Sequence, residues 1–291
     1  SGGPTAASRA GRSGEGPRRG LPATDRAHGG SLASIVTTAI PPSPATDPAP
    51  GTAPVSGAGH AARAVLALRG VGKTYPNGKV ALRDIDLVLA EGEFVFLVGP
   101  SGAGKSTLLR LLIRDELPSA GELSVDGRDL ARVPRRKVPE LRRKIGVVFQ
   151  DYKLLPTRTV RENVAFALEV TGTPRRRIRP AVDRALAVVG LGDAADQLPT
   201  TLSGGEQQRT AIARALVHEP RLIIADEPTG NLDPLISWEI IQLLLRINEL
   251  GVTVLMATHN ADVVTSLRRR VVALEEGRIV RDGVGGYHRE D

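Results

Sequence analysis

The sequence predicts an α/β fold in which buried, mainly parallel strands alternate with helices, with an antiparallel layer at the front. Two observations favour it. Nearly continuous apolar runs such as 93–98 and 222–225 stop at a glycine or a carboxylate, which is typical of strands covered on both faces. Helix-length segments with apolar residues at helical spacing separate these runs. The chain has neither an internal repeat nor 18 consecutive apolar residues, so we expect no membrane span.

The strands are expected from the period of their apolar residues. Residues 82–89 alternate apolar with polar or charged side chains and fit a half-exposed strand, whereas 93–98 is almost wholly apolar. The last two strands form a hairpin that turns at Glu276 and Gly277. In chain order, strands are expected over 65–68, 82–89, 93–98, 145–149, 222–225 and 252–257, with the hairpin over 271–280.

Helices are expected between these strands, each from apolar residues that recur at helical spacing. The first follows a glycine-rich loop, and the last lies between two buried strands. Gly190 follows the third in the position of a C-cap. The expected helices are 106–114, 161–170, 180–189, 204–216 and 235–250.

Residues 1–63 differ in composition from the rest of the chain. They are rich in Ala, Gly, Pro and Ser, and the first aromatic residue is Tyr75. Such a segment cannot bury enough apolar surface to offset its ordering entropy. We therefore expect a disordered extension over 1–63, either a tether or a segment without function, and one folded domain over 64–287.

The formal net charge of +7 raises the question of a nucleic-acid or membrane-surface partner. The basic runs are scattered and lack interleaved aromatic residues, unlike the stacking platforms of single-strand binders, so we expect no nucleic-acid partner. Solvated surface is the favoured interpretation, and contact with anionic lipid headgroups is the alternative. The basic runs are 135–137, 142–144, 175–177 and 268–270.

The absence of cysteine excludes disulfides and thiolate chemistry and favours a cytosolic location.

Residues 99–107, GPSGAGKST, match the P-loop pattern between an expected strand and an expected helix. Glycines let backbone N–H groups wrap phosphates, and the helix N-terminus adds its positive dipole. In such a loop Lys105 reaches the β- and γ-phosphates, and Ser106 is a ligand of Mg²⁺. The nucleotide-binding residues expected here are Gly99, Pro100, Ser101, Gly102, Ala103, Gly104, Lys105, Ser106 and Thr107.

An acidic pair, Asp226 and Glu227, ends the buried strand at 222–225. Acidic pairs are common at strand ends, but the P-loop upstream favours a catalytic interpretation. Asp226 would then join the shell of the Mg²⁺ ion, and Glu227 would orient and polarise the attacking water.

A second anion-binding helix terminus opens at 203–207, SGGEQ. One γ-phosphate is not easily served by two such termini of a single chain. The sequence therefore indicates that this loop closes on a nucleotide held by another copy. The residues expected to act in this way are Ser203, Gly204, Gly205, Glu206 and Gln207.

Taken together, these motifs resemble the complete ordered set of the ABC (ATP-binding cassette) ATPases. The set comprises the P-loop, Gln150, the loop 202–207, Asp226 with Glu227, Asn231 to Asp233, and His259. The resemblance implies a P-loop NTPase cassette, with a RecA-like mixed or parallel sheet core, an antiparallel β subdomain and an α-helical signature subdomain. It also implies ATP and Mg²⁺ as ligands and a head-to-tail homodimer, in which two ATP molecules are held between P-loops and signature loops.

The same resemblance assigns roles to single residues. Tyr75 corresponds to the aromatic residue that stacks on adenine, and Asp233 to the aspartate at the dimer seam. The implied catalytic residues are Glu227, His259, Gln150 and Lys105, and the implied metal ligands are Ser106, Gln150 and Asp226. Asn260 replaces the aspartate that commonly follows the histidine, which affects no catalytic role.

Within the ABC ATPases, several stretches resemble the FtsE family of bacterial cell-division ATP-binding proteins. High use of arginine and alanine favours a GC-rich, actinobacterial source. The resemblance implies a membrane partner of the FtsX type that controls peptidoglycan hydrolases, and a place on the cytoplasmic face of the plasma membrane at the septum. The 63-residue extension departs from the family pattern. The stretches are 93–107, 138–146, 149–155, 163–169, 225–233 and 252–259.

Three alternatives remain at this point. One is the ATPase of an exporter or lipoprotein-release complex of the MacB or LolD type, which shares the SGGEQQ and Asn-Leu-Asp features. Another is a soluble ABC ATPase acting on ribosomes or DNA, although such proteins usually carry two cassettes or a long coiled coil. The third is a non-catalytic scaffold that binds ATP, which the intact Glu227 and His259 disfavour.

Overall fold

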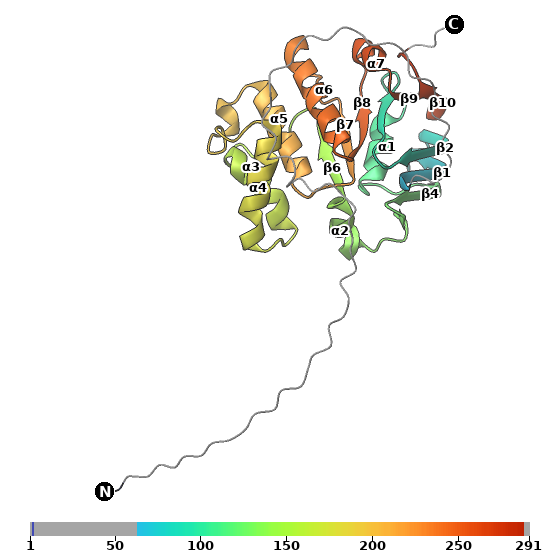
Figure 1. Ribbon diagram of the computed structural model, residues 1–291. Coiled ribbons are helices and arrows are strands. Elements are labelled where there is room, and N and C mark those ends of the chain that lie inside the picture. The colour runs from blue at the N-terminus through green and yellow to red at the C-terminus, as the bar shows by residue number, and fades with distance from the viewer. Residues whose placement is uncertain (1, 3–62, 288–291) are drawn as a thin grey trace, which may run out of the picture.

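The computed structural model describes Gly2 and residues 63–287, so the expected disordered extension lies almost wholly outside the described residues. Two sheets form the framework (Figure 1). One has four antiparallel strands in the order β2-β1-β4-β5, and the other has six strands in the order β10-β9-β3-β8-β7-β6. The first contains β1 (Ala64–Thr74), β2 (Val80–Ala90), β4 (Ala120–Val125) and β5 (Arg128–Asp129). The second contains β3 (Phe94–Val98), β6 (Ile145–Val148), β7 (Leu222–Asp226), β8 (Thr253–Ala257), β9 (Arg270–Glu275) and β10 (Arg278–Val284).

The six-stranded sheet is parallel from β6 to β9, and only β10 is antiparallel to its neighbour. Every residue of β3 and β8 is buried, as expected of central strands with both faces covered. The fold class expected from the sequence is therefore confirmed, with the parallel core and the antiparallel layer both present.

Helices cover both faces of this sheet and extend beyond one edge of it. In Figure 1, α3, α4 and α5 gather beside β6, on the side away from β1, β2 and β4. One apolar cluster joins these helices and α6 to one face of the sheet, and a second joins α1 and the four-stranded sheet to the other. No helix in the described part of the chain is long and apolar enough to cross a bilayer. The helices are α1 (Lys105–Leu112), α2 (Val138–Arg142), α3 (Val160–Val170), α4 (Arg175–Val189), α5 (Gly204–Leu216), α6 (Pro234–Glu249) and α7 (Ala261–Leu267).

The expectations about elements were incomplete: β5, α2 and α7 were not expected, and β1 is longer than the expected strand over 65–68. The helix expected over 180–189 begins at Arg175, and Pro180 lies inside it. Its first turns are mostly arginine, so they carry too few apolar residues to show a helical period. The strand β4 was not expected, because its first three residues are exposed and include Gly121.

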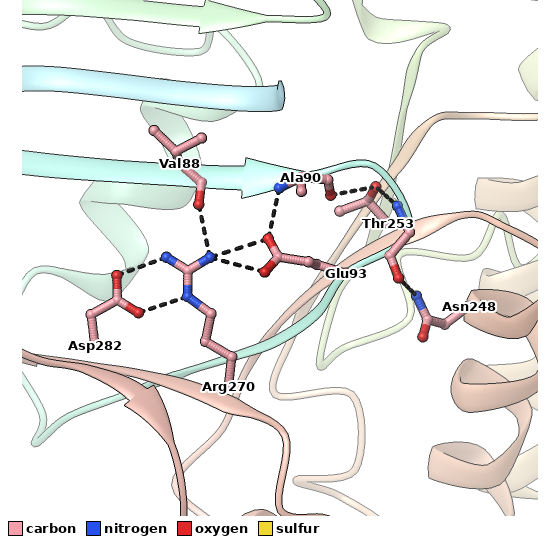
Figure 2. Close-up of polar contacts among 8 residues, drawn as sticks. Val88, Ala90, Glu93, Asn248, Thr253, Arg270 and Asp282 are labelled. Carbon is pink, nitrogen blue, oxygen red and sulfur yellow. Dashed lines mark hydrogen bonds and ion pairs between the residues drawn. The ribbon is translucent and has the colours of Figure 1, made fainter. Parts of the chain in front are cut away.

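A polar cluster joins the two sheets at the N-terminal edge of the parallel strands (Figure 2). The Arg270 guanidinium, at the start of β9, donates to both oxygens of Asp282 on β10 at 2.6 and 2.7 Å. It also donates to both oxygens of Glu93 at 3.1 Å and to the carbonyl of Val88 on β2 at 2.9 Å. Its side chain is 22% exposed. Its hydrogen bonds to Asp282 and the negative charges of Asp282 and Glu93 raise the pKa of Arg270, so the guanidinium is charged at neutral pH.

The cluster continues from the sheets to α6. The backbone of Ala90 donates to Glu93 at 2.6 Å, and the Thr253 hydroxyl accepts from Gly92 at 3.0 Å. Asn248 on α6 donates to the carbonyls of Gly92 and Val252, both at 2.9 Å. The turn between β2 and β3 is therefore held on both sides (Figure 2).

We expect Arg270→Met to lower the free energy of unfolding by about 2 kcal/mol, because it leaves two partly buried carboxylates without their cation. Urea unfolding at neutral pH measures this. Arg132→Met is the matched control: it breaks an exposed pair with Asp129, and it should change stability by less than about 0.5 kcal/mol. Equal losses in the two variants would contradict the role given to Arg270.

Candidate functional site

The loop between β3 and α1 is shaped by close backbone contacts. A Cβ atom on Gly99 would lie 2.1 Å from the carbonyl oxygen of Leu274, and one on Gly104 would lie 2.7 Å from that of Ala81. Both glycines have positive φ angles, 147° and 109°. At these positions the loop admits only residues without a side chain.

The N-terminus of α1 is open to an anion. Gly104 is its N-cap and supplies no side-chain hydrogen bond, and the first turn holds no acidic residue. The free N–H groups of this turn and the helix dipole therefore favour negative charge in front of the loop. Lys105 Nζ donates to the carbonyls of Gly99 and Pro100, which holds the ammonium group against the same loop.

A cavity of about 470 Å³ lies over this loop. Every residue expected to bind nucleotide or to act in catalysis lines it, although these residues come from widely separated parts of the chain. Lys79, Ala81 and Tyr287 line it as well. The residues expected from the sequence are 99–107, Tyr75, Gln150, Asp226, Glu227 and His259.

The acidic pair forms one wall of the cavity. Glu227 has a φ of 46°, and its Oε1 lies 2.9 Å from His259 Nδ1. The backbone N–H of His259 donates to Glu227 Oε2 at 3.4 Å, so strands β7 and β8 place the two side chains together. Burial raises the pKa of Asp226, and the charge of Glu227 raises it further, while Lys105 and Arg110 oppose the shift. A cation would be favourable beside this pair.

Gln150 is linked to the loop that follows the acidic pair. Its side-chain amide donates to Asn231 Oδ1 at 3.4 Å, and the Asn231 amide donates to the carbonyl of Gln150 at 3.1 Å. A Cβ on Gly230 would lie 2.8 Å from the Gln150 amide nitrogen, so the two loops are in direct contact. A movement of Gln150 would therefore displace residues 230–231, which it contacts.

The loop at 203–207 lies outside the cavity, which none of its five residues lines. Ser203 is the N-cap of α5 and forms a capping box with Glu206. The hydrogen bonds from Ser203 lower the pKa of Glu206. Asp233 is likewise a cap: its side chain accepts from Leu235 and Ile236 at the start of α6. Ser203 and Asp233 thus each cap a helix of their own chain, and neither lines the cavity of that chain.

Tyr287 was not expected from the sequence. It follows β10 and lines the cavity, and its backbone N–H donates to the Thr265 hydroxyl oxygen on α7 at 3.3 Å. A single tyrosine after two glycines has no periodic or motif signal.

The ABC transporter family model matches residues 82–230, about half of the chain. The chain belongs to the ABC transporter family. Its curated relatives include the cell division ATP-binding proteins FtsE of Streptococcus pneumoniae and Mycobacterium tuberculosis, 54% and 51% identical over 228 residues. Each alignment covers 78% of this chain and 99% of the relative. FtsE of Escherichia coli is 48% identical, over 74% of this chain and 96% of its own length.

Solved ABC cassettes share the fold. The cbiO1 structure from Clostridium perfringens has a TM-score of 0.71 at 35% identity, covering 76% of this chain and 88% of that one. The dimeric cassette MJ0796 bound to ADP and phosphate has a TM-score of 0.67 at 36% identity, covering 75% and 98%. With this family and this site, the chain is an ABC-type ATPase, and the expected ATP-binding cassette is confirmed.

The close packing of α5 against α6 leads to a prediction about stability. A Cβ on Gly205 would lie 2.6 Å from Ile236 Cγ2 on α6. We expect Gly205→Ala to destabilise the protein, because overpacking costs about 1–3 kcal/mol and outweighs the gain in helix propensity. Gly192→Ala is the control, since a Cβ there meets no atom within 4 Å. Thermal unfolding compares them, and an unchanged midpoint for Gly205→Ala would contradict the overpacking expected against Ile236.

Proposed function

We propose that the chain is the ATP-hydrolysing subunit of an FtsEX-type complex, and that it drives an FtsX-like membrane partner which regulates peptidoglycan hydrolysis in cell division. The observation that carries the proposal is the match to curated FtsE proteins at 48–54% identity over 96–99% of their lengths. The location that follows is the cytoplasmic face of the plasma membrane at the division septum.

The reaction is ATP + H₂O → ADP + phosphate. Glu227 orients the attacking water and accepts its proton, and His259, 2.9 Å away, holds that carboxylate and contacts the γ-phosphate. Lys105 and the backbone N–H groups of 99–104 stabilise the charge on the transferred phosphoryl group. Gln150 reports the state of the γ-phosphate to the segment that follows it, 151–162.

Mg²⁺ fits the donors at the acidic wall. Ser106 and Asp226 offer a hydroxyl and a carboxylate, the oxygen ligands that Mg²⁺ prefers, and Gln150 offers an amide oxygen. Within the described residues there is no group of three or more His, Cys, Asp or Glu side chains able to hold a metal alone. Ser106, Asp226 and Gln150 would hold the ion, which would supply positive charge to the phosphoryl oxygens of the nucleotide.

A homodimer accounts for the position of the 203–207 loop. That loop opens α5 outside the cavity of its own chain, and an α-helix N-terminus favours an anion. Head-to-tail pairing brings it to the γ-phosphate of the second copy, with Asp233 at the seam. The dimeric MJ0796 cassette supports this arrangement.

The segment 151–162 is the proposed contact with the membrane partner. Tyr152, Leu154 and Leu155 are each half-buried, so they pack partly inward and leave part of their apolar surface open. Asn163 on α3 holds this segment by accepting from the Leu155 N–H at 2.7 Å and donating to its carbonyl at 3.1 Å. The contact surface is therefore ordered before the partner binds.

We expect Glu227→Gln to bind ATP normally and to lower phosphate release by about a hundredfold or more, because the amide cannot accept the water proton. Phosphate release is measured with the full chain and its solubilised membrane partner. Glu91→Gln, on an exposed ion pair with Arg221, is the control and should keep the wild-type rate. Undiminished function of Glu227→Gln in complementation would favour the ATP-binding scaffold.

The partner is identified by pull-down of the ATP-bound Glu227→Gln chain from detergent-solubilised membranes, followed by mass spectrometry. Recovery of an FtsX-like four-span protein is the expected result. A permease of the macrolide-exporter or lipoprotein-release type would keep the ATPase assignment and overturn the division role.

A further inference from the structure

The ring of Tyr75 is held by its hydroxyl as well as by its backbone. The phenol oxygen lies 3.2 Å from Glu116 Oε1 and 3.1 Å from Thr107 Oγ1. A phenol has one proton, which goes to the carboxylate, so the Thr107 hydroxyl donates to the phenol oxygen. The side chain that lines the cavity is therefore fixed at its far end by α1 and by the segment after it.

Lys73 completes the cluster from β1. Its Nζ lies 3.0 Å from Glu116 Oε2, donates to the carbonyl of Leu117 at 2.9 Å, and lies 5.2 Å from the centroid of the Tyr75 ring. The side chains of Lys73 and Glu116 are 14% and 20% exposed, so this pair is screened less by water than a surface pair.

Glu116 is suited to accept these hydrogen bonds. Burial alone would raise its pKa, but the hydrogen bond and charge of Lys73, with hydrogen bonds from Tyr75 and Arg110, leave the pKa of Glu116 lowered. The carboxylate is therefore ionised at neutral pH and acts as an acceptor toward both side chains.

The backbone of this loop is anchored by other contacts. The Ser119 hydroxyl accepts from the Thr74 N–H at 3.0 Å and donates to the Thr74 carbonyl at 3.2 Å. The Ser119 N–H donates to the Gly72 carbonyl at 2.8 Å. These contacts attach the end of β1 to the start of β4 and hold the backbone there. The hydrogen bond between Glu116 and the Tyr75 hydroxyl therefore holds the aromatic side chain rather than the backbone.

We propose that Lys73 and Glu116 are a positioning pair, which fixes the Tyr75 ring as a platform for the base of the nucleotide. The proposal rests on the proposed function, since it requires that the cavity takes ATP. The ammonium group occupies one face of the ring, and the opposite face remains for a planar base. A ring fixed before binding loses less conformational freedom when the base stacks, so the pair favours ligands that carry a base.

Calorimetric titration of the full chain with ATP, and separately with tripolyphosphate, tests the pair in the presence of Mg²⁺. Tripolyphosphate has the phosphates of ATP and no base. Glu116→Leu and Lys73→Met are each expected to weaken ATP binding about fivefold, the cost of ordering one side chain on binding. Both should leave tripolyphosphate binding unchanged. Glu169→Leu, which breaks the exposed pair with Arg158, is the matched control and should alter neither ligand.

Tyr75→Phe keeps the ring and removes only its hydroxyl, so it tests the tether with little risk to folding. It should weaken ATP binding about as much as Glu116→Leu. The double variant Tyr75→Phe/Glu116→Leu should lose no more ATP affinity than either single variant, because both substitutions remove the same hydrogen bond between the phenol and the carboxylate. If Glu116→Leu does not fold, Tyr75→Phe and Glu116→Gln carry the same comparison.

Equal losses for ATP and tripolyphosphate would overturn the proposal, since the cluster would then support the phosphate loop in general. Unchanged ATP affinity in the three single variants, or additive losses in the double variant, would overturn it too. Failure of the wild-type chain to bind ATP would instead contradict the proposed function, and the two failures are thereby distinguished.

Discussion

The rest of the site depends on a backbone-to-backbone contact among three distant segments. The P-loop, the end of β9 and the start of β2 approach so closely that no side chain fits between them at Gly99 and Gly104. Hydrogen bonds lock this meeting point: the Gly277 N–H donates to the Ala103 carbonyl at 3.0 Å, and the Gly277 carbonyl accepts from Arg83 at 2.7 Å. The loop takes its anion-binding shape because the hairpin β9–β10 and the four-stranded sheet hold it there.

The opposite edge of the sheet is held by charge rather than by close packing. There Arg270 joins β9 to β10, to the start of β3 and to the end of β2 through Asp282, Glu93 and the Val88 carbonyl. The six-stranded sheet is thus attached to the four-stranded one at both edges. These two attachments hold together the sheets from which Tyr75 and the P-loop come, and both line one cavity.

The sequence predicted the parts of this fold and site that are encoded locally. Buried strands such as β3 and β7 show as apolar runs, and the P-loop and the Ser203 cap of α5 show as motifs, because each depends on a few consecutive residues. The rest depends on contacts between distant residues. Glu116 reaches Tyr75 across 41 positions, and Tyr287 reaches the cavity only through the course of β10. Neither has a local pattern. The helical period of apolar residues placed the start of α4 too late, because its first turns, 175–179, are mostly arginine and add little to that period.

The separation of the 203–207 loop from its own cavity has a genetic consequence. In the proposed head-to-tail pair each cavity would be built from two copies of the chain, so a copy altered at Ser203 would impair the site of its neighbour while its own P-loop stays intact. Two alleles, one altered in the P-loop and the other in the loop at 203–207, could restore one working cavity when they are expressed together. An allele altered at Glu227 would instead be dominant, because it sequesters intact chains in stalled pairs. Whether a cavity works would therefore depend on the alleles of both chains in the pair and not on one chain alone.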